Sequence, residues 1–313
     1  MENFLFALNT VLPFLLYIAF GYGVRMSGLA DEDFMKRLNK VIFQAFFPIL
    51  MFNNLYSIPE GMTLNLRLVA VAIISVLLLQ AVLLAVVPRL VKENERRGVI
   101  IQAIFRSNFV LFGLPLTIAV FGDSAASIAA MMVTVVVSIY NTTSVFILEM
   151  FNGEGKSDIK KTLKAVATNP LLQGAIVGLI FFFLGIKLPG SLVTPIAAFS
   201  NMTSPLAIYV LGGTLQFKAI RKNLKYLVPT LTCKLFILPA IIIAIAYAFG
   251  LRGLELFLLI AVYATPVAAA SYPMAQNMGG DGELAGQFVV ISTAVSMFTL
   301  FLWIFFMKSV GLI

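Results

Sequence analysis

The sequence predicts an all-α membrane protein with ten transmembrane helices, arranged as two inverted five-helix repeats with broken, crossing helices 4 and 9. Three observations predict this fold class: the composition, the distribution of basic residues among the loops, and an internal repeat. The chain has 313 residues, of which 60% are hydrophobic and 12% charged, with a mean hydropathy of +1.00. A soluble domain carries about 25% charged residues. A lipid bilayer is therefore the expected solvent.

Ten apolar segments are separated by short hydrophilic breaks. Each is close to the ~20 residues that a helix needs to cross the hydrocarbon core. Lipid offers the backbone no hydrogen-bond partner, so these segments must be helical. The expected helices cover residues 4–24, 40–57, 66–88, 99–121, 125–150, 165–186, 192–216, 226–249, 254–279 and 283–307. A soluble bundle is the alternative, but its apolar runs would be shorter and striped.

Basic residues gather in alternate loops. Sixteen of the 22 Lys and Arg residues lie in the loops that follow expected helices 1, 3, 5 and 7, and four lie on the opposite side. The positive-inside rule places the richer loops in the cytoplasm and both termini outside. The chain begins with Met1-Glu2 and lacks the basic start of a signal peptide, so the first segment is expected to remain as a helix. We expect a multi-pass protein of the plasma (inner) membrane.

The two halves of the chain repeat each other. The matching residues are Pro13, Gly21 and Pro48 with Pro170, Gly178 and Pro205, at an offset of 157, and then Pro115 and Gly122-Asp123 with Pro273 and Gly280-Asp281, at an offset of 158. Each half contains five helices, an odd number, so the second half enters the membrane from the opposite side. This predicts a first repeat at 1–151, a cytoplasmic linker at 152–164 and an inverted repeat at 165–313. Many secondary transporters have this architecture.

Expected helices 4 and 9 carry Gly and Pro at matching positions. Proline removes a backbone donor and clashes with the preceding turn, and glycine unwinds easily. We expect both helices to be discontinuous, with second halves that start after Pro115 and after Pro273. Simple kinks are the alternative, because membrane helices tolerate proline. Two helix starts that meet at the midplane would present unpaired N–H groups and positive dipole ends, which favours an anion.

The candidate substrate-binding residues flank these breaks or are polar inside apolar segments. They are Arg106, Asn108, Gly113, Pro115, Thr265, Pro266, Ser271, Pro273, Asn277, Lys234, Asn53 and Asn141. Arg106 and Lys234 are the only basic residues well inside apolar segments, where a charge costs about 2.5–3.5 kcal/mol or more. They either face an anionic substrate or extend towards the headgroups. Asn53 and Asn141 have a second interpretation as contacts between helices. Asp123 and Asp281 are expected to be helix N-caps.

Other kinds of chemistry have little support in the composition. The sequence has no His and one Cys, and it shows no buried acid pair and no Ser-His or Ser-Lys motif. We therefore expect no catalytic residue, no metal and no cofactor, and the protein is not expected to be an enzyme. The net charge of +8 reflects the basic loops rather than a nucleic-acid partner. The expected partners are a small organic anion and the lipid bilayer.

Four motifs resemble the auxin efflux carrier (AEC) family of membrane transporters. They are Asn108 to Pro115 (N-x-x-x-x-G-L-P), Pro266-Val267-Ala268, Asn277-Met278-Gly279-Gly280-Asp281 and Phe47-Pro48-x-x-x-Phe52. The resemblance covers essentially the whole chain, although plant members carry a long cytosolic loop between the halves. It implies a carrier of an auxin-like, malate-like or malonate-like anion. It also implies a scaffold of helices 1, 2, 6 and 7, a mobile transport part of helices 3–5 and 8–10, elevator-type motion and a homodimer.

Two other functions are alternatives to an organic-anion carrier. A sodium-coupled symporter similar to the bile acid symporters would share the broad architecture. A passive anion channel would share basic residues inside the membrane, but would not need paired broken helices. The sequence predicts neither the particular anion nor the direction of transport nor the coupling ion.

Overall fold

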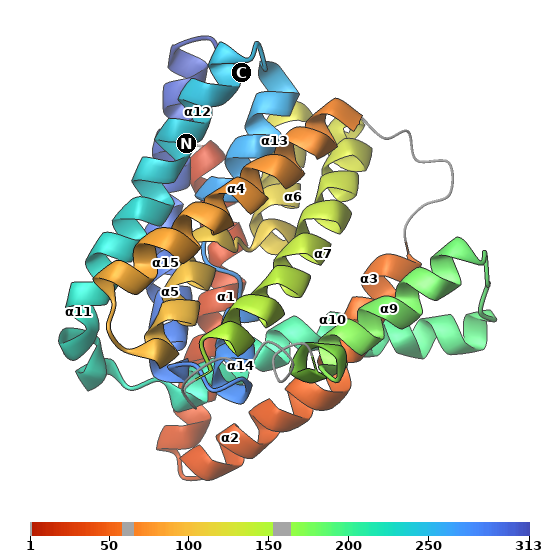
Figure 1. Ribbon diagram of the computed structural model, residues 1–313, viewed down its shortest axis with the longest axis vertical. Helices are drawn as coiled ribbons and strands as arrows, with labels where there is room; N and C mark the ends of the chain where they lie inside the picture. The colour runs from red at the N-terminus through yellow and green to blue at the C-terminus, as the bar shows by residue number, and fades with distance from the viewer. Residues whose placement is uncertain (1, 58–65, 153–163) are drawn as a thin grey trace.

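The computed structural model describes residues 2–57, 66–152 and 164–313, and this part of the chain is almost entirely helical (Figure 1). The expected all-α class is confirmed. The expected linker at 152–164 lies outside the described residues except for its two end residues. The elements of the first half are α1 (Glu2–Met26), α2 (Glu32–Val41), η1 (Ile42–Phe46), α3 (Phe47–Tyr56), α4 (Leu66–Leu90), α5 (Asn94–Phe105), η2 (Phe109–Gly113), α6 (Leu114–Phe121), η3 (Asp123–Ala125) and α7 (Ala126–Met150). Those of the second half are α9 (Pro170–Phe183), α10 (Gly190–Thr214), α11 (Phe217–Thr232), η4 (Cys233–Ile237), α12 (Leu238–Ala248), α13 (Gly253–Ala264), α14 (Ser271–Asn277) and α15 (Gly282–Ser309).

Several helices have the length and composition of membrane spans. Within the described ranges, four continuous helical stretches qualify: Leu66–Leu90, Asp123–Met150, Ile220–Ala248 and Gly282–Ser309. Shorter apolar helices cover Leu12–Met26, Phe109–Phe121, Pro170–Phe183 and Gly253–Ala264. The protein is therefore embedded in a membrane. Two of the short helices, Phe109–Phe121 and Gly253–Ala264, are parts of the segments that the sequence predicts to be broken.

Two membrane segments begin earlier than hydropathy predicts. The expected start at residue 40 is replaced by α2, which begins at Glu32 and runs through η1 into α3. Likewise α11 begins at Phe217 rather than at residue 226. Asp31 caps α2, since its carboxylate accepts a hydrogen bond from the Phe34 N–H at 2.6 Å. Both starts are amphipathic and carry several charges, so a search for continuous apolar residues does not detect them.

Each of the three π-turns in the described ranges is closely followed by a proline. The turns η1, η2 and η4 each end two residues before a proline, at Pro48, Pro115 and Pro239 respectively. Proline clashes with the carbonyl four residues earlier. A wider π-turn moves that carbonyl away, so the helix continues with a local bulge instead of ending.

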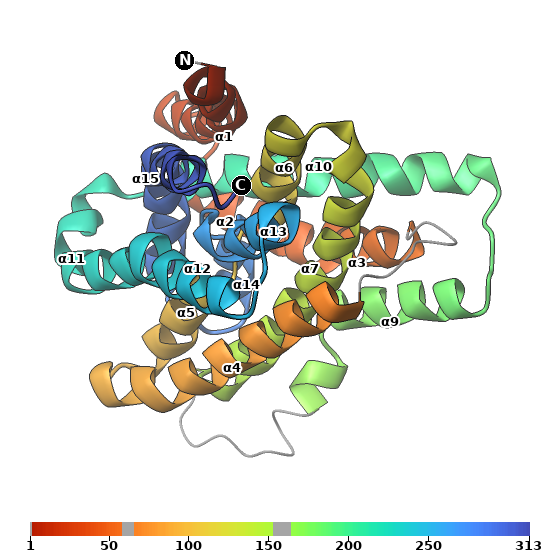
Figure 2. The same cartoon turned by 90° about the horizontal axis from the view of Figure 1, so that it is seen from above.

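Two groups of helices pack mainly within themselves. The first group contains α1–α3, η1, α9 and α10; in it α1 and α2 pack on α10, and α3 packs on α9 and α10. The helices α3, α9 and α10 extend together to one side of the molecule in both views (Figures 1 and 2). The second group contains α4–α7 and α11–α15. The groups meet where α15 contacts α1, α7 contacts α3 and α9, and α14 contacts α10 and η1.

Glycines allow the helices of the first group to pack backbone against backbone. A Cβ atom at Gly21 would lie 1.9 Å from the carbonyl oxygen of Tyr209, and one at Gly178 would lie 2.8 Å from that of Phe52. Small residues are the usual means of close helix packing in membranes. The two contacts correspond to each other, because Gly178 and Tyr209 follow Gly21 and Phe52 by the same 157 residues.

Candidate functional site

The two interrupted segments cross through short extended stretches. Helix α5 ends at Phe105, residues 106–108 have no helical conformation, and the chain becomes helical again at Phe109. Helix α13 ends at Ala264, and α14 begins at Ser271. Ser107 and Val267 form an antiparallel bridge. The Asn108 N–H donates to the Pro266 carbonyl oxygen at 2.7 Å. Each break therefore supplies hydrogen-bond partners for some backbone groups of the other. Unpaired backbone groups would be costly inside the membrane.

The breaks do not lie where the sequence predicted them. The expectation that the second halves start after Pro115 and Pro273 is wrong, because the helical conformation resumes at Phe109 and at Ser271. Pro115 follows the π-turn η2, and Pro273 lies in the first turn of α14, where a missing N–H is tolerated. Pro266 lies in the second break. It disfavours helix at Thr265, which has φ −70° and ψ 154°.

Arg106 is a buried cation that has no acidic partner in the described part of the chain. Its side chain is 3% exposed, and it donates hydrogen bonds to Asn141 Oδ1 on α7 and to Met274 Sδ on α14. The described residues place no carboxylate oxygen within 4.0 Å of its guanidinium. The side chain is thus held in the interior and does not extend to the surface. A buried charge of this kind is strongly unfavourable unless a counter-charge joins it.

A cavity of about 90 Å³ lies beside Arg106, at the boundary between the two helix groups. The crossing contributes residues 106–111 and 268–270 to its lining. The rest of the lining is Phe47, Leu50, Met51 and Asn54 of α3, Val137, Tyr140 and Asn141 of α7, and Ser204 of α10. The Asn108 Nδ2 is buried and has no hydrogen-bond partner among the described residues. The N–H groups of residues 109–111 belong to a first helical turn, which has no acceptor inside its own helix. The cavity therefore offers one positive charge and several donors.

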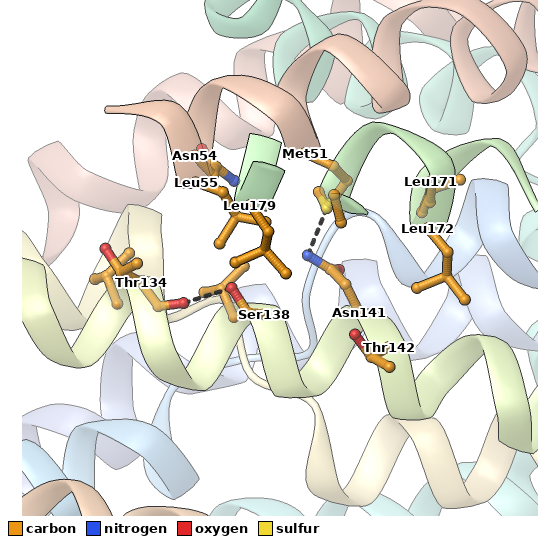
Figure 3. Close-up of a pocket in the computed structure, with 13 residues that line it drawn as sticks. Met51, Asn54, Leu55, Thr134, Ser138, Asn141, Thr142, Leu171, Leu172 and Leu179 are labelled. Carbon is orange, nitrogen blue, oxygen red and sulfur yellow. Dashed lines mark hydrogen bonds between the residues drawn. The ribbon is translucent and has the colours of Figure 1, made fainter. Parts of the chain in front are cut away.

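A second cavity, of about 130 Å³, continues from the first between α3, α7 and α9 (Figure 3). Both cavities are lined by Met51, Asn54, Val137 and Asn141. The Asn141 amide donates to Met51 Sδ at 2.9 Å, as Figure 3 shows. Asn141 therefore contacts the guanidinium with one end of its amide and the first helix group with the other.

Lys234 is buried but does not line either cavity. It lies in η4, is fully buried, and donates to the Ser107 hydroxyl. Neighbouring residues of an extended chain point to opposite sides. Lys234 therefore meets the crossing on the side opposite to Arg106 and Asn108. The structure places it as a support of the extended stretch rather than in the cavity.

The other predicted residues lie around the crossing without lining the cavity. The Thr265 hydroxyl donates to Ala261 within its own helix, and the Asn277 amide donates to the Pro273 carbonyl. Asn53 donates to Ser200 on α10 at 3.3 Å, a contact between helices. A Cβ at Gly113 would overlap the Phe109 ring. The Ser271 hydroxyl is buried without a partner.

The sequence did not select Asn54 or Ser204 as candidates. Asn54 neighbours the chosen Asn53, but successive helical residues point in directions about 100° apart. Only Asn54 lines the cavity. Tertiary packing fixes which face of a helix points to the cavity, so two adjacent asparagines cannot be distinguished from the sequence.

One predicted cap is confirmed and one is wrong. Asp281 caps α15 by accepting from the Leu284 N–H at 2.9 Å, and it also pairs with Arg96 at 3.0 Å. Asp123 is the first residue of η3, and neither η3 nor α7 has a side-chain cap.

Helices that cross a membrane, two paired breaks and an adjoining cavity beside a buried cation are typical of membrane transport proteins. A family model described as membrane transport protein matches residues 6–304, and the chain belongs to this family. The family predicted from the sequence motifs is thereby confirmed. Over 96% of its length the chain is 24% identical to an uncharacterized transporter of Methanothermobacter thermautotrophicus, covering 98% of that protein. It is also 22% identical to an uncharacterized transporter of Methanocaldococcus jannaschii, over 95% of this chain and 97% of that protein.

Proposed function

We propose that the protein is a secondary transporter that carries a small organic anion, of the auxin-like, malate-like or malonate-like class, across the membrane. The guanidinium of Arg106 is the observation that carries this proposal. It lies beside a cavity, has no acidic partner among the described residues, and is flanked by the unpartnered amide of Asn108. A substrate carboxylate would supply the missing counter-charge through charge-assisted hydrogen bonds.

The proposal includes ten membrane helices in two inverted repeats, at 1–151 and 165–313, joined by a cytoplasmic linker at 152–164. The matching contacts of Gly21 and Gly178 support it, because one offset of 157 residues relates both pairs. The crossing gives independent support. Asn108 and Pro266 are 158 residues apart, which is the offset of the later repeat, and they are hydrogen-bonded to each other. Residues that correspond between two repeats meet in this way on a two-fold axis.

We further propose elevator-type alternating access in a homodimer. The first helix group corresponds to the scaffold of helices 1, 2, 6 and 7, and the second group to the mobile transport part. The cavity at their boundary draws its charged residue from the transport part and several apolar residues from α3. Movement of the second group along the first would carry a bound anion past α3 and α9. Exposed apolar residues on α9, such as Ile176, Ile180 and Phe183, offer a surface for a second copy.

The proposed orientation puts both termini outside the plasma (inner) membrane. The two chain ends lie at the same end of the molecule, and α2 and α14 lie at the other (Figure 1). The basic loops that follow α1 and α4 also lie at this second end (Figure 1). Two expected spans separate these loops, so the chain returns to the same side of the membrane.

Uptake by proteoliposomes tests the function. The purified protein would be reconstituted, and entry of a panel of labelled mono- and dicarboxylates would be measured with the sodium and proton gradients varied separately. Saturable uptake and exchange of internal for external anion would support a carrier. Uptake that requires sodium would favour the symporter alternative. Flux that neither saturates nor exchanges would favour the channel and contradict the proposal.

A further inference from the structure

A large apolar groove lies on the second helix group, away from the crossing cavity. Its volume is about 630 Å³, and its walls are residues of α4, α5 and α11. The apolar lining includes Leu83, Val87 and Leu90 of α4, Ile104 of α5 and Pro229 of α11. This volume is within the range of small-molecule sites, about 300–1,000 Å³. The groove has no role in the proposed anion site.

One end of the groove is basic. Lys92 follows α4, Lys225 lies on α11, and both are exposed at the rim. Glu93 also lies at the rim, but its carboxylate is engaged by the Tyr226 hydroxyl at 3.0 Å and by Arg96 at 3.6 Å. The Lys225 ammonium lies 4.8 Å from the centre of the Tyr226 ring. Among the described residues, neither lysine has a carboxylate oxygen within 4.0 Å, so each ammonium can still pair with an anionic group.

The other end of the groove reaches Cys233. Cys233 follows Lys225 by eight residues, which is about 12 Å along a helix at 1.5 Å per residue. Its neighbour Lys234 points the other way and holds Ser107 in the crossing. The groove thus runs from a basic rim into an apolar interior. It ends at Cys233, next to Lys234, which holds the crossing beside the proposed anion site.

We propose that this groove binds one anionic phospholipid of the surrounding bilayer. The phosphate lies at Lys92 and Lys225, and one acyl chain lies along α4 and α11 as far as Cys233. Basic pockets between membrane helices on the cytoplasmic side are suited to anionic headgroups. The apolar walls match an acyl chain and give a soluble anion no partner. The inference uses the proposed orientation only to assign the leaflet, and it does not depend on the transported substrate.

Native mass spectrometry of the detergent-purified protein tests the headgroup contact. Phosphatidylglycerol would be added to the wild type, to Lys92→Gln/Lys225→Gln, and to the control Arg221→Gln/Lys222→Gln. The control removes the same charge from exposed positions of α11 that do not line the groove. We expect binding to be about thirtyfold weaker in the groove variant and near normal in the control. Equal weakening in both double variants would show a non-specific charge effect and overturn the proposal.

The thiol of Cys233 tests occupation of the groove. The rate of its reaction with N-ethylmaleimide would be compared in vesicles of phosphatidylcholine alone and of phosphatidylcholine with phosphatidylglycerol. We expect the anionic lipid to slow the reaction several-fold in the wild type and in the control, but not in the groove variant. If the rate were the same in both vesicles while the mass spectra showed lysine-dependent binding, the lipid would lie outside the groove and the proposal would fail. Neither readout requires transport, so failure here is distinguishable from failure of the proposed function.

Discussion

At the scale of single residues, the proposed anion site depends on Arg106. It is buried, it is held by Asn141 and Met274, and it lacks an acidic partner in the described part of the chain. Arg106→Gln keeps the size and a hydrogen-bonding amide but removes the charge. A lost charged hydrogen bond costs about 1.5–3 kcal/mol, so we expect anion affinity to fall about ten- to hundredfold. Binding would be measured by competition with a labelled anion in proteoliposomes.

The control for this variant is Arg221→Gln, at an exposed position of α11. Arg96 would be unsuitable, because it pairs with Asp281, the cap of α15. Lys234→Met is a second comparison, since it removes a buried charge that does not line the cavity. We expect a smaller loss of affinity from Lys234→Met than from Arg106→Gln. Equal affinity in the wild type and Arg106→Gln would show that this guanidinium has no part in binding.

At the scale of elements, backbone contact between α1 and α10 requires glycine at position 21. A Cβ at Gly21 would lie 1.9 Å from a carbonyl oxygen, whereas one at Gly23 would meet nothing within 4 Å. We expect Gly21→Ala to lower stability by about 1–3 kcal/mol through overpacking. Gly23→Ala should be neutral or slightly stabilising, because alanine is the better helix former. The melting temperature of each variant would be measured from the loss of its monodisperse size-exclusion peak after heating. Equal melting temperatures for the two variants would contradict the packing of α1 on α10.

The second prediction for an element concerns the break between α13 and α14. Pro266 has no N–H and disfavours helix at Thr265, so alanine there allows α13 to extend through the break. We expect Pro266→Ala to reach the membrane at a normal level and to transport poorly, because the crossing with Asn108 is lost. The control is Pro195→Ala, at an exposed position of α10. Normal transport by Pro266→Ala would show that the break is maintained without this proline.

At the scale of the whole molecule, the orientation is testable with cysteine pairs. Ser27 follows α1 and Ser309 ends α15, and both are exposed. In a Cys233→Ser background, an impermeant thiol reagent added to intact cells should label Ser309→Cys and leave Ser27→Cys unlabelled. Permeabilised cells should show labelling of both. The opposite pattern in intact cells would reverse the orientation inferred from the basic loops.

The sequence predicted the large-scale features better than the site. Apolar length, loop charge and the repeat offset depend on many residues, so the helical class and the two interruptions were predictable. The exact breaks were not. Pro115 and Pro273 were the strongest local signals, yet one follows a π-turn and the other begins a helix. The cavity also depends on which residues of α3 and η4 face the crossing. That is why Asn54 rather than Asn53 lines the cavity, and why Lys234 contacts the crossing on the side away from Arg106.

The central claim is that the protein is a carrier whose anion pairs with Arg106. The most direct measurement is counterflow: proteoliposomes are loaded with an unlabelled dicarboxylate such as malonate, and the entry of labelled external anion is followed. The wild type should accumulate label transiently above equilibrium and saturate with external concentration. Arg106→Gln should require an external concentration about ten- to hundredfold higher, while Arg221→Gln should behave as the wild type. Absence of counterflow for every carboxylate tested, or counterflow unaffected by Arg106→Gln, would contradict the account.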